Sequence, residues 1–98
     1  MYQLEIKERA VEMMQESYAW YEQAQQGLGA QFLESLDEAY DKIAAHPEYF
    51  SLIEKQYRQI KLSIFPYVIV YEIMEDKVVV FALFHTSRNP ELKISDKE

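Results

Sequence analysis

Residues 57–90 read YRQIKLSIFPYVIVYEIMEDKVVVFALFHTSRNP, and this stretch predicts three consecutive strands. Apolar and polar side chains alternate over residues 58–64, as in a strand with one buried face. Phe65-Pro66 interrupts that strand, because proline has no N–H to donate to a sheet. The stretch therefore begins with a short strand whose two faces differ.

The other two strands are predicted over residues 68–74 and 78–84. Both are apolar on both faces, the pattern of central strands in a sheet. Only Glu75-Asp76 separates them, which predicts a two-residue hairpin connection without the usual glycine. The whole stretch is thus expected to form a three-stranded meander.

Upstream, the sequence predicts one short strand and two helices. Tyr2, Leu4 and Ile6 alternate with polar residues, as expected of a strand with one apolar face. Two apolar stripes then recur at three- and four-residue spacing, the pattern of amphipathic helices. The first stripe contains Val11, Met14, Tyr18 and Tyr21, and the second contains Phe32, Leu33, Leu36, Tyr40 and Ile43. A glycine-containing segment, residues 27–29, separates the helices, and Pro47 ends the second one.

The predicted order is β-α-α-β-β-β. This is an α+β fold in which the N-terminal strand and a helical hairpin pack on one face of a mainly antiparallel sheet. Residues 1–90 are expected to form a single domain, because 98 residues are too few for two cores. The charged segment 91–98 is expected to fray. Since the hairpin covers one sheet face only, we expect an exposed apolar patch on the other, which a partner would cover.

The composition excludes several classes of protein. The chain has no cysteine, so disulfide frameworks and thiolate metal sites are excluded, and we expect neither a metal nor a cofactor. Met1 leads directly into the amphipathic pattern, without the cationic and apolar segments of a secretion signal. No run approaches the roughly 20 apolar residues that span a bilayer. These features predict a cytoplasmic protein that does not bind membranes.

The net charge of −7 is unevenly distributed. Residues 1–50 carry ten acidic and three basic residues, whereas residues 51–98 carry seven of each. Nucleic-acid binding relies on clustered Lys and Arg that displace counterions from phosphates, so direct DNA binding is not expected. The acidic first half would instead attract a basic segment of another protein.

Several short motifs occur in a recognisable order. They are Trp20-Tyr21-Glu22, Gly27-Leu28-Gly29, Phe32-Leu33, Arg58, Phe65-Pro66-Tyr67-Val68-Ile69-Val70-Tyr71 and His85-Thr86-Ser87-Arg88-Asn89-Pro90. Together they resemble the RelE/ParE superfamily of type II toxins, over nearly the whole chain from Tyr2 to Pro90. The resemblance implies a small cytoplasmic bacterial toxin. It also implies a hetero-oligomer with a cognate antitoxin, whose C-terminal part wraps the toxin and keeps it inactive.

The superfamily contains two activities, which need different chemistry. RelE-like members cleave mRNA on the ribosome, which requires proton transfer and cations that stabilise the charge on the reacting phosphate. ParE-like members resemble protein inhibitors, and their target is DNA gyrase. In RelE-like nucleases the aromatic residue that opens the middle strand is commonly followed by a catalytic Arg, but here Tyr67 is followed by Val68. Those nucleases often carry two basic residues at alternate positions of the preceding strand, where this chain has Gln59 and Lys61.

These departures favour a ParE-like toxin, with DNA gyrase as the target that the resemblance implies. Loss of one transition-state donor typically costs about 10²- to 10³-fold in rate. The alternative is a RelE-like ribosome-dependent mRNA endonuclease that uses Lys61, His85 and Arg88. A third reading is an inactive homologue that acts only as a partner in its complex.

Two binding surfaces are predicted. The target-facing surface comprises Phe65, Pro66, Tyr67, His85 and Arg88. The antitoxin-facing surface comprises Trp20, Tyr21, Leu28 and Phe32.

Each polar candidate must be weighed between a structural role and a functional one. His85 lies in phase with Phe81 and Leu83, so it is equally well explained as the end of a buried strand. Arg58 is better explained by a structural role than by function, because such an Arg most often snorkels to the surface or pairs with a carboxylate, here that of Glu72 or of a helix acid. For Arg88 no packing need is apparent, which favours a functional role.

Overall fold

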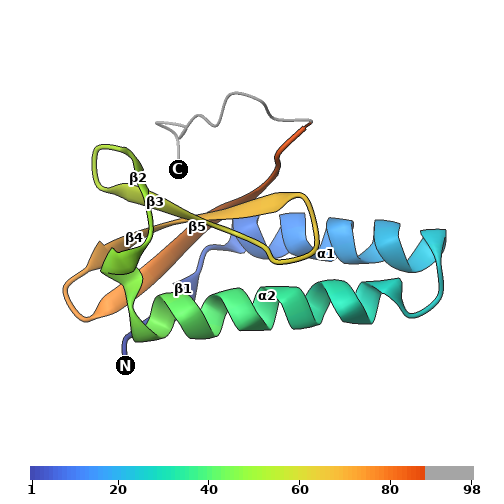
Figure 1. Ribbon diagram of the computed structural model, residues 1–98, viewed down its shortest axis with the longest axis horizontal. Coiled ribbons are helices and arrows are strands. Elements are labelled where there is room, and N and C mark those ends of the chain that lie inside the picture. Colours follow the sequence, from blue (N-terminus) through green and yellow to red (C-terminus); the bar gives the residue numbers. More distant parts are fainter. Residues whose placement is uncertain (88–98) are drawn as a thin grey trace.

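The computed structural model describes residues 1–87 and shows two helices packed on one five-stranded mixed sheet. The elements are β1 (Gln3–Ile6), α1 (Glu8–Ala24), α2 (Leu28–Ala45), the 3-10 helix η1 (Pro47–Tyr49), β2 (Leu52–Glu54), β3 (Tyr57–Lys61), β4 (Tyr67–Met74) and β5 (Lys77–His85). Figure 1 shows the two long helices lying antiparallel along one side of the sheet. This confirms the α+β fold and the helical hairpin. The predicted tail, residues 91–98, lies outside the described residues.

The sheet has the strand order β1-β5-β4-β3-β2. All neighbouring strands are antiparallel except β1 and β5, which pair in parallel from Gln3 opposite Lys77 to Ile6 opposite Val80. An ion pair between the Lys77 Nζ and a Glu5 carboxylate oxygen, 3.1 Å apart, bridges the same two strands. The first and last strands within residues 1–87 are therefore neighbours. No helix within residues 1–87 has the length and apolar character needed to cross a bilayer.

The main core lies between the helical hairpin and the sheet. At its centre, four aromatic rings pack edge to face or tilted, with centroid separations between 4.8 and 6.2 Å. These rings belong to Tyr21, Phe32, Phe65 and Tyr67. The two helical stripes predicted from sequence supply the helix side of this core, because residues at three- and four-residue spacing share one helix face.

Two strand predictions need correction. The strand predicted over residues 58–64 ends at Lys61, and the side chain of Ile64 is 74% exposed instead of buried. The strand ends early because the Leu62 N–H donates to the Tyr67 carbonyl oxygen at 2.9 Å, which closes the connection to β4. The edge strand β2 was not predicted, and it pairs with β3 through an irregular register.

A β-bulge interrupts the alternation of side chains in β5. Ala82 lies opposite Val70 and Val80 opposite Tyr71, so Phe81 is an extra residue. Val80 and Leu83 therefore face the helices and belong to the main core. Phe81 and Ala82 belong instead to a second, smaller cluster with Val79. The predicted common phase of Phe81, Leu83 and His85 is thus wrong for Phe81.

The predicted exposed apolar patch on the sheet face away from the helices is also wrong. Val68, Val70 and Val79 are all buried. A second small cluster of Val79, Phe81 and Ala82 packs with the partly buried Met13, Tyr57 and Phe84. The rings of Tyr57 and Phe81 lie 5.1 Å apart, which places aromatic side chains over neighbouring strands. Aromatic side chains of the sheet, together with Met13 of α1, therefore shield part of this face.

Two side chains connect the central strands to the segment that follows α2. The Tyr71 hydroxyl is fully buried and donates to the Pro47 carbonyl oxygen at 2.6 Å. The Arg58 guanidinium donates to the carbonyl oxygens of Glu48 and Phe50 at 3.1 and 2.7 Å. Arg58 thus has the structural role expected of it, although its partners are backbone carbonyls and not the carboxylate of Glu72.

The Tyr71 hydroxyl provides a test of this connection. We expect Tyr71→Phe to lower the free energy of unfolding by about 1–3 kcal/mol, because it leaves the Pro47 carbonyl oxygen without its donor. Chemical denaturation measures this, with Tyr49→Phe as the control. Tyr49 is 81% exposed, so a similar loss in both variants would contradict the assignment.

The same hydroxyl predicts a dependence of stability on alkaline pH. Burial, opposed in part by the charge of Arg58, raises the pKa of Tyr71 from 10 to about 12. The unfolded chain therefore loses this proton first, and stability falls as the pH rises from 10 to 12. Burial also raises the pKa of Tyr40, so we expect Tyr71→Phe to reduce the slope without abolishing it. An unchanged slope in denaturation measured across this range would contradict the prediction.

Candidate functional site

The end of β5 meets the turn that precedes β4. The Thr86 N–H donates to the Pro66 carbonyl oxygen at 2.8 Å. Tyr67 lies opposite His85 in the sheet, and their rings meet edge to face with centroids 5.0 Å apart. The structure therefore brings together Pro66, Tyr67 and His85, as the predicted target-facing surface requires.

The backbone fixes the orientation of the His85 ring. The Ser87 N–H donates to His85 Nδ1 at 3.1 Å, so Nδ1 is the acceptor and a neutral ring carries its proton on Nε2. The ring is partly exposed at the rim of the sheet. Both the strand-ending role and a surface contact of His85 are compatible with this geometry.

The residues of this surface differ in exposure. Phe65 and Tyr67 are only 6% and 5% exposed and belong to the aromatic core, whereas Pro66 is exposed. Pro66 and His85 can therefore contact a partner directly, and the two core aromatics hold them in position. Arg88 lies outside the described residues.

Strand register places Lys61 away from His85. Lys61 lies opposite Val68, which in turn lies opposite Phe84, so these three side chains share one sheet face. Tyr67 and His85 are the next pair along and project from the other face. The cations and proton carriers proposed for a nuclease are therefore not assembled on one face by the described residues.

A polar cavity of about 660 Å³ lies beside β3. Its lining includes Lys42 of α2 and Lys61, together with Ser51, Tyr49 and Gln59. Within residues 1–87, the side-chain oxygen of Gln59 is buried without a hydrogen-bond partner. The cavity offers two ammonium groups, and the contribution of Lys42 was missed because it comes from a helix distant in sequence. Over the same residues, no three His, Asp or Glu side chains form a potential metal site.

The predicted antitoxin-facing residues lie at the far end of the helical hairpin and divide into two pairs. Trp20 is 56% exposed, and Leu28 is half-buried at the start of α2. Tyr21 and Phe32 are buried in the aromatic core, where the Tyr21 ring contacts that of Trp20 at 5.1 Å. Trp20 and Leu28 are thus the pair accessible to a partner.

A carboxylate holds the turn between the helices. Glu22 of α1 accepts hydrogen bonds from the N–H groups of Gly27 at 3.0 Å and Gly29 at 2.9 Å. Gly27 has a φ of +89°, a left-handed conformation that glycine adopts without strain. A Cβ at Gly29 would lie 2.7 Å from the Tyr18 ring and 2.8 Å from the Glu22 carboxylate, so a larger residue there would displace these side chains. The role of Glu22 was not predicted from the sequence.

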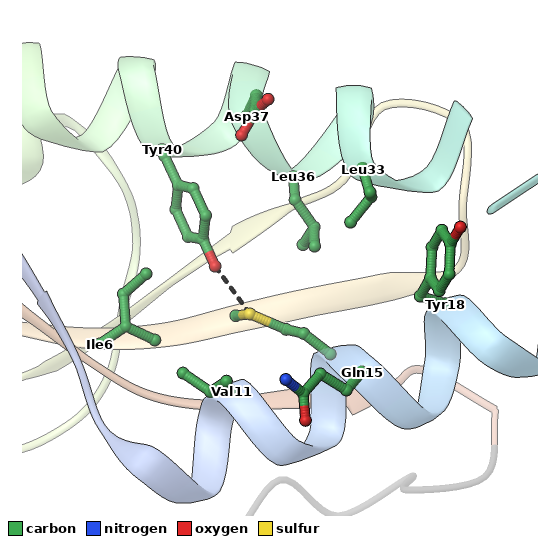
Figure 2. Close-up of a pocket in the computed structure, with 9 residues that line it drawn as sticks. Ile6, Val11, Gln15, Tyr18, Leu33, Leu36, Asp37 and Tyr40 are labelled. Atoms are coloured by element: carbon green, nitrogen blue, oxygen red, sulfur yellow. Dashed lines mark hydrogen bonds between the residues drawn. The ribbon is translucent and has the colours of Figure 1, made fainter. Parts of the chain in front are cut away.

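An apolar groove of about 390 Å³ runs between α1 and α2, and we call it the hairpin groove. Its lining residues are Ile6, Val11, Met14, Gln15, Tyr18, Leu33, Leu36, Asp37 and Tyr40. Figure 2 shows Tyr40 reaching from α2 toward α1, where its hydroxyl donates to the Met14 sulfur at 2.7 Å. The apolar stripes seen in the sequence could have predicted this groove. They are wider than the helix faces that contact the sheet, so some of their apolar residues, such as Val11, Tyr18 and Leu33, stay exposed between the helices.

Comparison with protein families gives a match over most of the chain. The family model described as "ParE toxin of type II toxin-antitoxin system, parDE" matches residues 4–90. The chain belongs to this toxin family. It is therefore a type II toxin of the RelE/ParE superfamily, as its motifs suggested. Among curated proteins, no relative of this toxin was found.

Solved structures of other RelE/ParE toxins share the fold. The intact E. coli RelBE toxin-antitoxin complex contains a chain that is 22% identical, with a TM-score of 0.65 over 85% of this toxin and 94% of that chain. A chain of the chromosomal ParDE system from P. aeruginosa is 10% identical, with a TM-score of 0.65 over 87% of this toxin and 96% of its own length. The isolated E. coli RelE toxin is 20% identical, with a TM-score of 0.64 over 99% of this toxin and 90% of its own length. At such identities the likeness extends to the fold alone, and both RelE and ParE structures share it equally.

Proposed function

We propose that this toxin is ParE-like, that it inhibits growth by binding a protein target, and that this target is DNA gyrase. A cognate antitoxin holds it inactive in the cytoplasm. The match to the ParE family model supports the proposal. The single observation that carries it is the identity of the residue that follows Tyr67.

That residue is Val68, and its surroundings suit a valine. Val68 is 4% exposed and lies between Lys61 and Phe84 in a row across three strands. An uncharged side chain there cannot stabilise a developing negative charge on a phosphate. Because one such donor is typically worth about 10²- to 10³-fold in rate, its absence argues against efficient RNA cleavage.

The separation of Lys61 and His85 supports the same conclusion. Proton transfer requires donor and acceptor groups within about 3 Å of the reacting atoms, or one water away. Side chains on opposite faces of a sheet do not meet that requirement together. His85 lies near Pro66 at the rim of the sheet, which supports a shared contact surface, and Arg88 follows His85 closely in sequence.

The antitoxin partner is proposed from the neighbouring structures. The E. coli structures include the intact RelBE toxin-antitoxin complex and a RelE mutant in complex with an antitoxin RelBc peptide. For this toxin we assign Trp20 and Leu28 to the direct antitoxin contact. Tyr21 and Phe32 support them from the core.

The alternative is a RelE-like mRNA endonuclease with Lys61, His85 and Arg88 as its functional residues. The observation that favours it is the polar cavity, in which Lys42 and Lys61 could hold an RNA phosphate. A toxin homologue without activity, which persists as a complex partner, is the third outcome.

Two assays with purified components, a gyrase supercoiling reaction and a translation reaction, distinguish these functions. We expect the toxin to block DNA supercoiling by gyrase and to leave mRNA intact in a translation reaction. Arg88→Ala should abolish inhibition, because it removes the cation of the proposed target surface. Lys61→Ala should leave inhibition unchanged, since Lys61 lies on the opposite face from His85. Ribosome-dependent RNA cleavage that Lys61→Ala abolishes would establish the alternative, and neither activity would indicate an inactive homologue.

A further inference from the structure

We propose that a two-part cavity at the end of α2 binds an N-acylated amino acid, which presents an apolar side chain, a free carboxylate and an amide N–H. The site consists of the polar cavity beside β3 and an apolar cavity of about 490 Å³. Lys42, Tyr49 and Phe50 line both, so one ligand reaches into the two parts. Cavities of roughly 300–1,000 Å³ are typical of small-molecule sites. This ligand site is independent of the proposed contact with gyrase.

The polar cavity provides two cations without a neighbouring acid. Lys42 and Lys61 line it, and none of the residues that line it is acidic. Within residues 1–87, neither ammonium group takes part in an ion pair. The toxin as a whole has a net charge of −7, so its field repels a polyanion more strongly than a ligand with a single negative charge. The cavity therefore suits one carboxylate.

A buried acceptor in the polar cavity requires a donor from the ligand. Gln59 lines this cavity, and within the described part of the chain its side-chain oxygen is buried without a hydrogen-bond partner. Buried polar atoms in folded proteins are normally hydrogen-bonded. A carboxylate has no proton to donate, so the donor must be a group close to it. In an N-acylated amino acid the amide nitrogen is attached to the same carbon atom as the carboxylate, which meets this requirement.

The apolar cavity accepts the side chain of the ligand. The surface that lines it is almost entirely apolar, and Ala45, Tyr49 and Phe50 contribute to it. Tyr49 is 81% exposed, and its ring meets that of Phe50 edge to face with centroids 5.2 Å apart. Contact with an apolar side chain removes these rings from water, and an aromatic side chain also packs edge to face against them. The best ligand therefore carries an aromatic side chain.

The backbone that carries these two aromatic rings is fixed before a ligand binds. The Arg58 guanidinium donates to the carbonyl oxygens of Glu48 and Phe50 at 3.1 and 2.7 Å. The Tyr71 hydroxyl donates to the Pro47 carbonyl oxygen at 2.6 Å, which holds the start of the same segment. A preformed wall loses little conformational freedom on binding, so more of the contact energy contributes to affinity.

Strand β3 adds a backbone donor to the polar cavity. The Gln59 N–H points away from β4 and donates to the Ser51 carbonyl oxygen at 3.0 Å. Because alternate residues of an antiparallel strand direct their N–H groups to the same side, the Lys61 N–H also points away from β4. Strand β2 begins at Leu52, which pairs with Arg58, so it does not extend beside Lys61. A carboxylate in the cavity can therefore accept from this N–H as well as from the ammonium groups.

Matched small ligands test the site on the intact toxin. N-acetyl-phenylalanine has all three features, whereas its amide lacks the charge, N-acetylglycine lacks the apolar side chain and phenylpropionate lacks the N–H. We expect NMR titrations to give a dissociation constant near about 1 mM for N-acetyl-phenylalanine. Each of the others should bind at least about threefold more weakly. Amide signals of residues 42–51 and 59–61 should shift and those of residues 27–29 should not. Equal binding of the acid and its amide, or shifts confined to other residues, would overturn the proposal.

Toxin variants assign the contacts. Lys42→Gln and Lys61→Gln should each weaken N-acetyl-phenylalanine at least about threefold and leave its amide unaffected, because only the acid pairs with an ammonium group. Lys55→Gln is the control, since it changes the net charge equally at an exposed turn outside both cavities. Gln59→Met should weaken N-acetyl-phenylalanine but not phenylpropionate, which has no N–H to donate. Thermal melts show that the variants stay folded. An effect of Lys55→Gln equal to those of the two cavity lysines would contradict the proposed contacts.

Two further ligands distinguish the sources of this chemistry from a nucleotide. A heptapeptide that ends in phenylalanine with a free carboxylate presents the same group at the end of a chain. Binding at least about tenfold tighter than that of N-acetyl-phenylalanine identifies a protein C-terminus as the source, and any smaller gain identifies a free acylated amino acid. Adenosine monophosphate should bind more weakly than N-acetyl-phenylalanine, and equal or tighter binding would refute the proposal in favour of a nucleotide site. A toxin that binds N-acetyl-phenylalanine in the cavity but does not inhibit gyrase would refute the proposed function alone.

Discussion

Phe32→Ala is expected to lower the free energy of unfolding by about 3–5 kcal/mol, because removal of a buried aromatic leaves a cavity. The Phe32 side chain is fully buried, and its ring lies 5.3 Å from those of Tyr21 and Phe65 and 5.4 Å from that of Tyr67. Domains of this size have roughly 5–15 kcal/mol of stability in total. At about 4–8 °C per kcal/mol, the melting temperature would fall by tens of degrees. Thermal unfolding followed by circular dichroism measures this.

Leu33→Ala is the matched control for Phe32→Ala. Leu33 is the next residue of α2, and its side chain is 44% exposed, so the same substitution type removes much less buried surface. We expect a loss of less than about 1.5 kcal/mol. If the two variants melted at similar temperatures, the aromatic cluster would not be the centre of the core. The comparison also shows whether any loss of antitoxin binding by Phe32→Ala reflects unfolding instead of a lost contact.

Glu22→Ala is expected to destabilise the helical hairpin by about 1–3 kcal/mol. The Glu22 carboxylate accepts hydrogen bonds from two N–H groups at the start of α2, where a negative charge is favourable. Without it, the Gly29 N–H lies buried with no acceptor in its place. Denaturant unfolding gives the stability, and hydrogen exchange at the start of α2 shows whether the loss is local.

Two further substitutions separate the contributions of Glu22. Glu22→Gln keeps an oxygen acceptor and removes the charge, so we expect a loss smaller than that of Glu22→Ala. Gln23→Ala alters the adjacent exposed residue and should change stability by less than about 0.5 kcal/mol. A loss in Gln23→Ala equal to that in Glu22→Ala would show that helix propensity, not the contact with the turn, accounts for the effect.

Much of the fold could be predicted because long periodic segments specify their own structure. The apolar stripes of α1 and α2 keep the helical period over many residues, and β4 and β5 are continuous apolar runs of the length expected of central strands. The glycine-containing turn and Pro47 gave the helix ends to within about two residues. Local sequence decides these features, so no knowledge of distant contacts was needed.

The features that were missed depend on contacts between distant segments. Strand β2 has three residues, too few to show a period, and it is a strand only because β3 lies beside it. The bulge at Phe81 is set by pairing with β4 and leaves no trace in an all-apolar run. Ile64 has the type and phase of a core residue, yet the turn back to β4 begins before it. Pairing and chain reversal, not propensity, decide each of these cases.

The candidate sites also combine features that local sequence predicts with features that depend on contacts between distant segments. That Pro66, Tyr67 and His85 meet follows from the meander that the sequence predicted, which makes the last two strands neighbours. The helical stripes predicted the apolar environment of Tyr21 and Phe32, but not that Phe65 and Tyr67 join them in one buried cluster, because aromatic residues suit a core and a binding surface equally well. Nor could the sequence place Lys42 and Lys61 at the same cavity, since they come from different layers of the fold.

The parallel pairing of β1 with β5 has a consequence for biosynthesis. The N-terminal strand leaves the ribosome first, but its partner is made only after most of the chain has been translated. Because translation adds about 5–20 residues per second, β1 stays unpaired for several seconds before β5 is synthesised. The helical hairpin, whose contacts are close in sequence, can form during this interval. A partner that recognises the hairpin could therefore engage the toxin before its sheet is complete.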